Sequence, residues 1–142
     1  MQNERCVKWE PVPDINYPCA DISFGFDQTS TLWVIMHFSR VKSLLPRDLK
    51  LQFKKPLAFR WEDESCSTLI LPKLAPKCLE SKWMQWNFPL LHIENSSWLK
   101  QYKNNQPVLS QEHVHLVLIA MNDCVELIAL PHVEANWIEA IK

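Results

Sequence analysis

The chain has 142 residues, of which 47% are apolar and 22% charged, so it belongs to the folded globular class. Its 15 basic and 16 acidic residues nearly cancel, and no overall field therefore attracts nucleic acid or an anionic membrane. The single glycine, Gly25, excludes a glycine-rich phosphate loop and a G-x-S-x-G nucleophile elbow. This length predicts a single domain over residues 1–142.

The longest apolar runs, such as residues 116–121, are far shorter than the ~20 residues of a membrane-spanning helix. The first ten residues are polar and charged, which predicts a cytoplasmic protein without a secretory signal. Five cysteines without C-x-x-C spacing favour neither a disulfide framework nor a zinc ribbon. Reduced, buried, non-catalytic thiols are expected at Cys6, Cys19, Cys66, Cys78 and Cys124.

The first half of the chain predicts strands. Residues 1–20 contain three prolines and should form an extended lead-in. Two strands, over 21–27 and 31–41, are expected around a polar turn. The second is apolar on both sides, which is typical of a strand deep in a sheet and covered on both faces.

Strict alternation follows in two segments, 49–53 and 57–62, which are separated by Pro56. Alternation of period two predicts half-buried strands, because successive side chains point to opposite faces. The side chains that should face the core from the second segment are Leu57, Phe59 and Trp61.

A helix containing residues 76–83 is expected, because Pro76 fits a first helical turn. Residues 86–93 alternate around Pro89 and should be extended at an edge or a bulge. A serine or asparagine cap within 95–97 then opens a short helix that ends near residues 104–105.

The clearest signal is a pair of β-rich runs, 114–120 and 125–130, around Asn122 and Asp123, which predicts an antiparallel hairpin. Beyond Pro131, apolar residues at i, i+4 and i+8 predict a C-terminal helix. Those residues are Val133, Trp137 and Ile141. The expected fold is a single α+β domain, mainly antiparallel sheet with two or three short helices.

Histidines offer the first candidate chemistry. His113 and His115 lie two apart in a strand, so both rings share one face and could chelate a divalent metal if a third ligand joined them. The alternative, a hydrogen-bonded pair at the strand start, is favoured, and no metal or cofactor is expected. His37 is expected to be a buried, hydrogen-bonded histidine.

Three successive carboxylates, Glu62, Asp63 and Glu64, end the second alternating segment. Glu62 and Glu64 share a face and could act as an acid and a base, whereas a solvated strand end is the more common role of such a run. No spacing points to a serine or cysteine nucleophile, and no catalytic residue is therefore assigned.

Charge is segregated along the chain. A basic stretch runs from Arg40 to Arg60, and its neighbouring aromatics make a single-strand nucleic-acid platform conceivable. Those aromatics have core-facing parity, however, so ordinary amphipathic strands explain the pattern better. The last third is acidic, with Glu112, Asp123, Glu126, Glu134 and Glu139 against Lys142.

Seven tryptophans exceed what one small core usually needs, and exposed tryptophan favours protein interfaces. Trp83, Trp86 and Trp98 lie in proline-broken or cap-adjacent segments, where complete burial is least expected. Two alternatives therefore remain: one of these rings belongs to an interface, or all seven tryptophans are purely structural.

The end of the chain resembles small bacterial proteins of the toxin-immunity type, including the partners of contact-dependent and polymorphic toxins. The resemblance covers about a third of the chain. It rests on His113 and His115, the apolar strand to Ala120, Asn122 and Asp123, the strand 125–129, and residues 94–99.

The resemblance implies a non-enzymatic cytosolic protein that binds and neutralises a cognate toxin, without nucleic acid or membrane as a partner. An acidic surface would suit a basic nuclease toxin, with an aromatic anchor supplying affinity. The alternatives are a small metal-dependent or Cys/His hydrolase and a nucleic-acid-binding module that uses the Arg40 to Arg60 stretch. The candidate partner-binding residues are Trp98, Glu62, Asp63, Glu64, Glu126 and Glu134.

Overall fold

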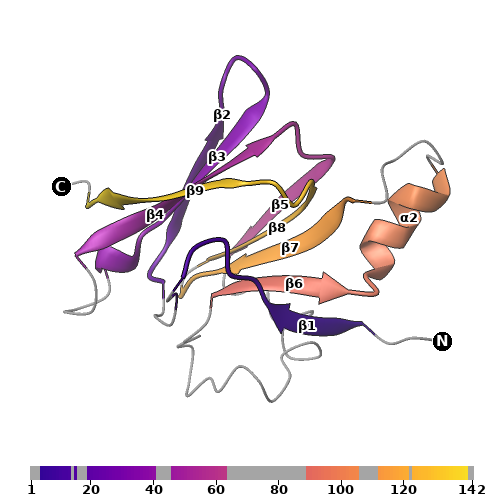
Figure 1. The fold of residues 1–142 in the computed structure, drawn as a ribbon, viewed down its shortest axis with the longest axis horizontal. Coiled ribbons are helices and arrows are strands. Elements are labelled where there is room, and N and C mark those ends of the chain that lie inside the picture. The colour runs from indigo at the N-terminus through magenta and orange to yellow at the C-terminus, as the bar shows by residue number, and fades with distance from the viewer. Residues whose placement is uncertain are drawn as a thin grey trace.

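The computed structural model describes residues 4–13, 15, 19–40, 46–63, 89–105, 112–121 and 123–140. Within these residues, nine strands form two antiparallel sheets (Figure 1). One α-helix and a short 3-10 helix accompany them. The elements are β1 (Arg5–Lys8), β2 (Ile22–Phe26), β3 (Thr31–Met36), η1 (Phe38–Arg40), β4 (Arg47–Lys54), β5 (Ala58–Asp63), β6 (Leu90–Glu94), α2 (Ser97–Asn105), β7 (Val114–Ile119), β8 (Asp123–Ala129) and β9 (Glu134–Glu139).

The five-stranded sheet has the order β1-β6-β7-β8-β5, and the four-stranded sheet has the order β2-β3-β4-β9. Both predicted hairpins, β2–β3 and β7–β8, are present. The alternating segments around Pro56 are also strands, β4 and β5, but they join different sheets. The chain therefore crosses from one sheet to the other at this proline.

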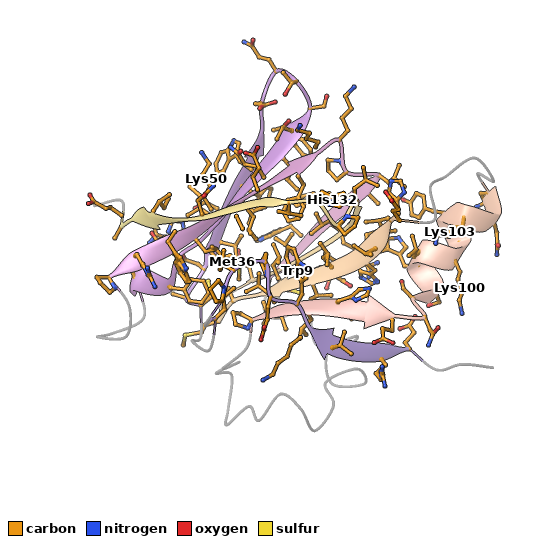
Figure 2. All side chains as sticks on the ribbon, in the orientation of Figure 1. Trp9, Met36, Lys50, Lys100, Lys103 and His132 are labelled. Carbon is orange, nitrogen blue, oxygen red and sulfur yellow. The ribbon has the colours of Figure 1, made fainter. Side chains whose placement is uncertain are left out.

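One apolar cluster fills the space between the two sheets. Leu51 of β4 and Leu118 of β7 are both fully buried in it. Met36 is fully buried in this cluster, whereas Trp9 is partly buried and packs against it (both are labelled in Figure 2). The ring centroids of Trp9 and Phe53 are 6.3 Å apart. A single core thus holds both sheets together, since burial of apolar surface is the main force for folding.

A second, smaller cluster lies on the opposite face of the five-stranded sheet and includes Val117, Ile119 and Cys124. Every residue of β8 and all but the first residue of β7 are consequently buried, so these two strands are covered on both faces. The sequence assigned that role to β3, which is indeed an interior strand of its sheet. That assignment was wrong for its outer face, because Trp33 and Ile35 are only half-buried.

The predicted C-terminal helix is wrong: residues 134–139 form β9 and pair with β4, with Trp137 opposite Leu49. The spacing of Val133 and Trp137 fits both a helix and a strand. Ala135 lies between them and also packs against the core, which completes a period of two. The open side of β4 supplied the hydrogen-bonding partner that selected the strand.

Helix α2 confirms the helix predicted near residues 95–105. The hydroxyl of Ser96 accepts a hydrogen bond from the amide of Leu99 at 3.1 Å, so Ser96 is the N-cap. Lys100 and Lys103 project from this helix in Figure 2. The helix predicted over 76–83 and the start of the extended segment 86–93 lie outside the described residues.

Candidate functional site

Two large aromatic side chains are exposed on edge strands of different sheets. Phe26 of β2 is 55% exposed, and Trp61 of β5 is 46% exposed. Phe59, two residues before Trp61 on the same face of β5, contacts both Phe24 and Phe26, at ring-centroid distances of 4.8 and 6.0 Å. We call these four residues the aromatic edge.

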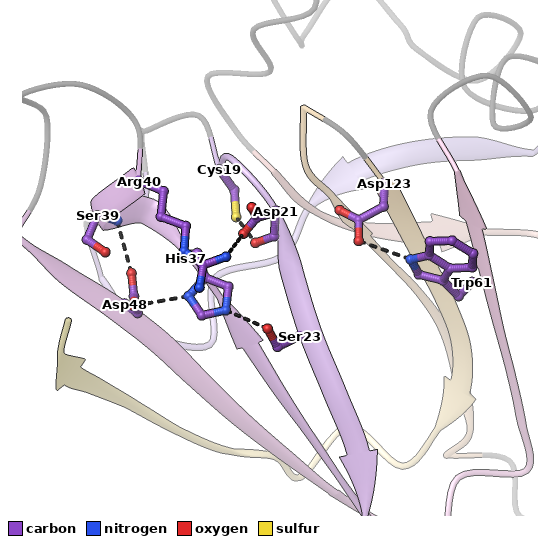
Figure 3. Close-up of polar contacts among 9 residues, drawn as sticks. All are labelled: Cys19, Asp21, Ser23, His37, Ser39, Arg40, Asp48, Trp61 and Asp123. Carbon is purple, nitrogen blue, oxygen red and sulfur yellow. Dashed lines mark hydrogen bonds and ion pairs between the residues drawn. The ribbon is translucent and has the colours of Figure 1, made fainter. Parts of the chain in front are cut away.

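Trp61 was predicted to face the core, and that prediction was wrong. It has the parity of Phe59, but it lies near the end of an edge strand, and nearly half of its surface stays exposed. Its indole nitrogen donates a hydrogen bond to Asp123 Oδ2 at 3.0 Å, which holds the ring in one orientation (Figure 3). An exposed ring that is already fixed loses little entropy when a partner covers it.

The predicted partner-binding residues separate in the structure. Glu62 is half-buried on β5 next to Trp61, and Asp63 ends the same strand. Glu134 is exposed at the start of β9, which is an edge of the other sheet. Glu64 lies outside the described residues.

The remaining two candidates, Trp98 and Glu126, belong to a polar chain under α2. Glu126 is only 4% exposed, so it contributes to the interior and not to an acidic surface. Its Oε1 lies 2.9 Å from Nε2 of His115, and its Oε2 accepts a hydrogen bond from Arg60 Nε at 2.9 Å. Nδ1 of His115 in turn lies 2.7 Å from the hydroxyl of Ser96.

The carboxylate of Glu126 determines which atoms donate and which accept in this series of hydrogen bonds. An ionised Glu126 can only accept, so Nε2 of a neutral His115 carries the proton and Nδ1 accepts from the Ser96 hydroxyl. Burial would raise the pKa of Glu126, but the hydrogen bonds from His115 and Arg60 outweigh it and hold the pKa below its ordinary value.

Trp98 lies at the centre of this arrangement. The Arg60 guanidinium lies 4.2 Å from the centroid of the Trp98 ring, and the His115 ring is 5.1 Å away in an edge-to-face contact. Glu4 accepts a hydrogen bond from the Ser97 amide at 2.7 Å, where a carboxylate also interacts favourably with the helix dipole. The chain from Ser96 to Arg60 therefore anchors α2 on the five-stranded sheet.

A second histidine is held in a similar chain on the four-stranded sheet. His37 is 2% exposed, which confirms the prediction of a buried, hydrogen-bonded histidine. Its Nε2 lies 2.7 Å from Ser23 Oγ, and its Nδ1 lies 3.2 Å from Asp48 Oδ2 (Figure 3). The other oxygen of Asp48 accepts a hydrogen bond from the Ser39 amide at 3.0 Å.

The carboxylate again sets the tautomer. Burial would raise the pKa of Asp48, but hydrogen bonds from Ser39 and His37 lower it below its ordinary value. The ionised carboxylate accepts from Nδ1–H of His37, and in this tautomer the lone pair of Nε2 accepts a hydrogen bond from the Ser23 hydroxyl. The orientation of the proton matches that of a general base beside a serine.

Within the part of the chain that the structure describes, no group of three or more His, Cys, Asp or Glu side chains is placed to hold a metal. The two histidines that could have shared a metal differ in position, because His113 precedes β7, which begins at Val114. Both ring nitrogens of His115 are engaged by Ser96 and Glu126. The ring of His115 is therefore committed to hydrogen bonds within the protein.

Three arginines of the basic stretch are engaged within the molecule. Arg40 pairs with Asp21 at 2.8 Å, and Arg60 pairs with Glu126. The Arg47 guanidinium lies 4.4 Å from the centroid of the Trp137 ring. These contacts favour a structural role for the arginines over a nucleic-acid platform.

The described cysteines are Cys6, Cys19 and Cys124, and all three are buried outside any disulfide. Burial raises the pKa of Cys19 and of Cys124 well above the ordinary value, with neighbouring carboxylates adding to the effect. Both thiols are therefore held in the unreactive protonated form. Cys66 and Cys78 lie outside the described residues.

Sequence reasoning missed Phe26, Ser23 and Asp48. The position of Phe26 beside a polar turn, at the end of a strand, was a usable signal for exposure. Ser23 and Asp48 gave none, because the contact with His37 depends on the register of β2 and β4 against β3, which no local pattern encodes.

No helix among the described residues is long and apolar enough to cross a membrane. Comparison of the chain with protein-family models, with curated proteins and with solved structures finds no match.

Proposed function

We propose that this protein binds another protein through the aromatic edge, and that the partner is a toxin which it neutralises in the cytoplasm, as proteins of the toxin-immunity type do. The observation that carries the proposal is the exposure of Phe26 and Trp61 on neighbouring edge strands. Neutralisation of this kind requires only occupancy of the partner and no turnover.

The location of these rings supports binding. Large exposed hydrophobic residues beside other aromatic rings are typical of interaction surfaces, and Phe59 of β5 connects the two edge strands through its ring contacts with Phe24 and Phe26. Tryptophan is also the residue most enriched among binding hot spots. Trp61 is held by Asp123, so its ring is presented in a fixed orientation before binding.

The acidic residues that follow Trp61 in the sequence support a basic partner. Glu62 and Asp63 continue β5 directly after Trp61. A toxin that cleaves nucleic acid needs basic residues to hold phosphate groups, and acidic side chains around an aromatic anchor would accelerate its encounter. Glu134 lies on β9, at the edge of the four-stranded sheet opposite β2, and is therefore outside the proposed interface.

The test is co-expression with the product of the reading frame directly upstream, scored by survival of the host and by co-purification. We expect Trp61→Ala to weaken the complex by ~2 kcal/mol or more, mainly through faster dissociation. Reversing Glu62 to Lys should instead slow association, and this effect should shrink as salt is added.

Ile138→Ala is the matched control, because Ile138 is a half-buried apolar residue on β9, the edge strand at the other side of the four-stranded sheet. This variant should protect the host and bind as the natural protein does. Unchanged affinity of the Trp61→Ala protein, or the absence of any complex with the upstream product, would contradict the proposal.

A further inference from the structure

Three polar side chains from three adjacent strands or their ends lie in a row on the outer face of the four-stranded sheet. Ser23 belongs to β2, His37 follows β3 directly, and Asp48 belongs to β4. The register aligns them, because Met36 is the partner of both Ile22 and Leu49. We propose that Ser23 is a nucleophile for acyl transfer from small apolar esters, with His37 as its base and Asp48 as the residue that positions His37.

The order of atoms in this row supports a reactive serine. Oγ of Ser23 lies 2.7 Å from Nε2, while Asp48 holds Nδ1 on the other side of the ring. The Ser39 amide fixes the second oxygen of Asp48, so the carboxylate and the ring cannot rotate independently. His37 and Asp48 are nearly fully buried, whereas Ser23 is only half-buried.

The chain under α2 provides an internal comparison. Ser96 is also bonded to a histidine that a carboxylate orients, but it is only 3% exposed. Its oxygen additionally accepts the amide of Leu99 as the helix cap. The hydroxyl of Ser96 is thus committed to structure, whereas that of Ser23 has no such second bond among the contacts of the described residues.

An apolar surface for the acyl group lies beside Ser23. Ile35 is the cross-strand partner of Ser23, and Trp33 is the partner of Gly25 on the same face. The indole of Trp33 covers Gly25, where a Cβ would lie only 2.6 Å from Cζ2. A short acyl chain would rest on Ile35 and Trp33, which favours esters of small apolar acids.

A backbone donor is also available. The hydrogen bonds from His37 N to Asp21 O and from Asp27 N to Thr31 O mark the bonded pairs of the β2–β3 ladder. Bonded and non-bonded pairs alternate in such a ladder, so the amide of Phe24 points away from β3 at the sheet edge. It is the donor that would stabilise the oxyanion formed next to Ser23.

The reaction proceeds in two steps. Ser23 Oγ bonds to the carbonyl carbon while its proton moves to His37 Nε2, and the ester C–O bond then breaks as that proton passes to the leaving alcohol. Water next attacks the acyl-serine with His37 as base, which releases the carboxylic acid and restores the hydroxyl. No other reactant is consumed.

The experiment uses the purified full chain with an alkyl fluorophosphonate and with p-nitrophenyl butyrate. We expect one phosphonyl adduct per protein, which peptide mass spectrometry places on Ser23 and not on Ser96. Ester hydrolysis should disappear in the Ser23→Ala protein.

Asp48→Asn should reduce the labelling rate by at least about 10²-fold, because it removes the carboxylate that selects the tautomer. Ser96→Ala is the control and should be labelled at the natural rate once its fold is verified by circular dichroism. Labelling of the natural protein needs no substitution, so the absence of an adduct on Ser23 of the folded chain overturns the proposal. A labelling rate that His37→Gln leaves unchanged overturns it as well.

Discussion

The indole of Trp33 lies so close to the backbone of Gly25 that a Cβ at residue 25 would meet Cζ2 of the ring at 2.6 Å. The only glycine of the chain is therefore located where a tryptophan from the neighbouring strand covers the backbone. Its φ is not positive, so the need for glycine is one of space and not of backbone conformation.

Gly25→Ala should accordingly destabilise the protein by about 1–3 kcal/mol, the usual cost of overpacking. In a Trp33→Ala background the same change should be neutral or stabilising, since alanine restricts the unfolded chain more than glycine does. Urea unfolding of the four proteins measures both effects. Equal costs in the two backgrounds would show that the indole is not the obstacle.

Glu126→Gln should destabilise the protein at neutral pH by about 2 kcal/mol, because it weakens buried hydrogen bonds to Arg60 and His115. The folded-state pKa of Glu126 lies below the ordinary value of 4.5, so its charge stabilises the fold above that pH. This contribution is lost as the pH falls through the folded-state pKa. Urea unfolding from pH 7 to 3 should show the two proteins converging, and a constant difference would contradict the expectation.

Ser96→Ala should cost about 2 kcal/mol, since it removes the N-cap of α2 and leaves Nδ1 of buried His115 without a donor. Ser97→Ala is the matched control, because Ser97 is exposed and bonds half-buried Glu4, so its loss should cost less than about 1 kcal/mol. Thermal unfolding followed by circular dichroism measures both changes. A similar loss in the two variants would argue against the buried chain as the anchor of α2.

Cys19 and Cys124 should resist alkylation by iodoacetamide in the native protein at pH 8, because burial raises the pKa of each thiol and keeps the reagent out. In 6 M urea both should react within minutes. Peptide mass spectrometry distinguishes them from the other cysteines. Rapid modification of either thiol in the native state would show that the structure around it opens.

The sequence by itself determined most of the strands and one helix. Leu49, Leu51 and Phe53 alternate with polar residues, and all three are buried in β4. The cap at Ser96 likewise marked the start of α2. These features are local, because a period of two or a capping hydroxyl acts on its own stretch of backbone.

Only the tertiary structure decided the form of the C-terminus and the exposure of the tryptophans. Trp137 suits a helix stripe and a strand equally, and the open edge of β4 made it a strand residue. Trp61 has core parity, but its strand became the edge of the five-stranded sheet, so the ring remained half in solvent.

The hydrogen bonds of His115 and His37 could not be predicted from the sequence either. His115 meets Glu126 across the β7–β8 hairpin and Ser96 from the cap of α2, while His37 meets Ser23 and Asp48 from strands on either side. Local periodicity fixes which face each side chain occupies, but a contact requires the register between strands as well. That register is set by packing of the two sheets around their shared core, which is a property of the whole chain.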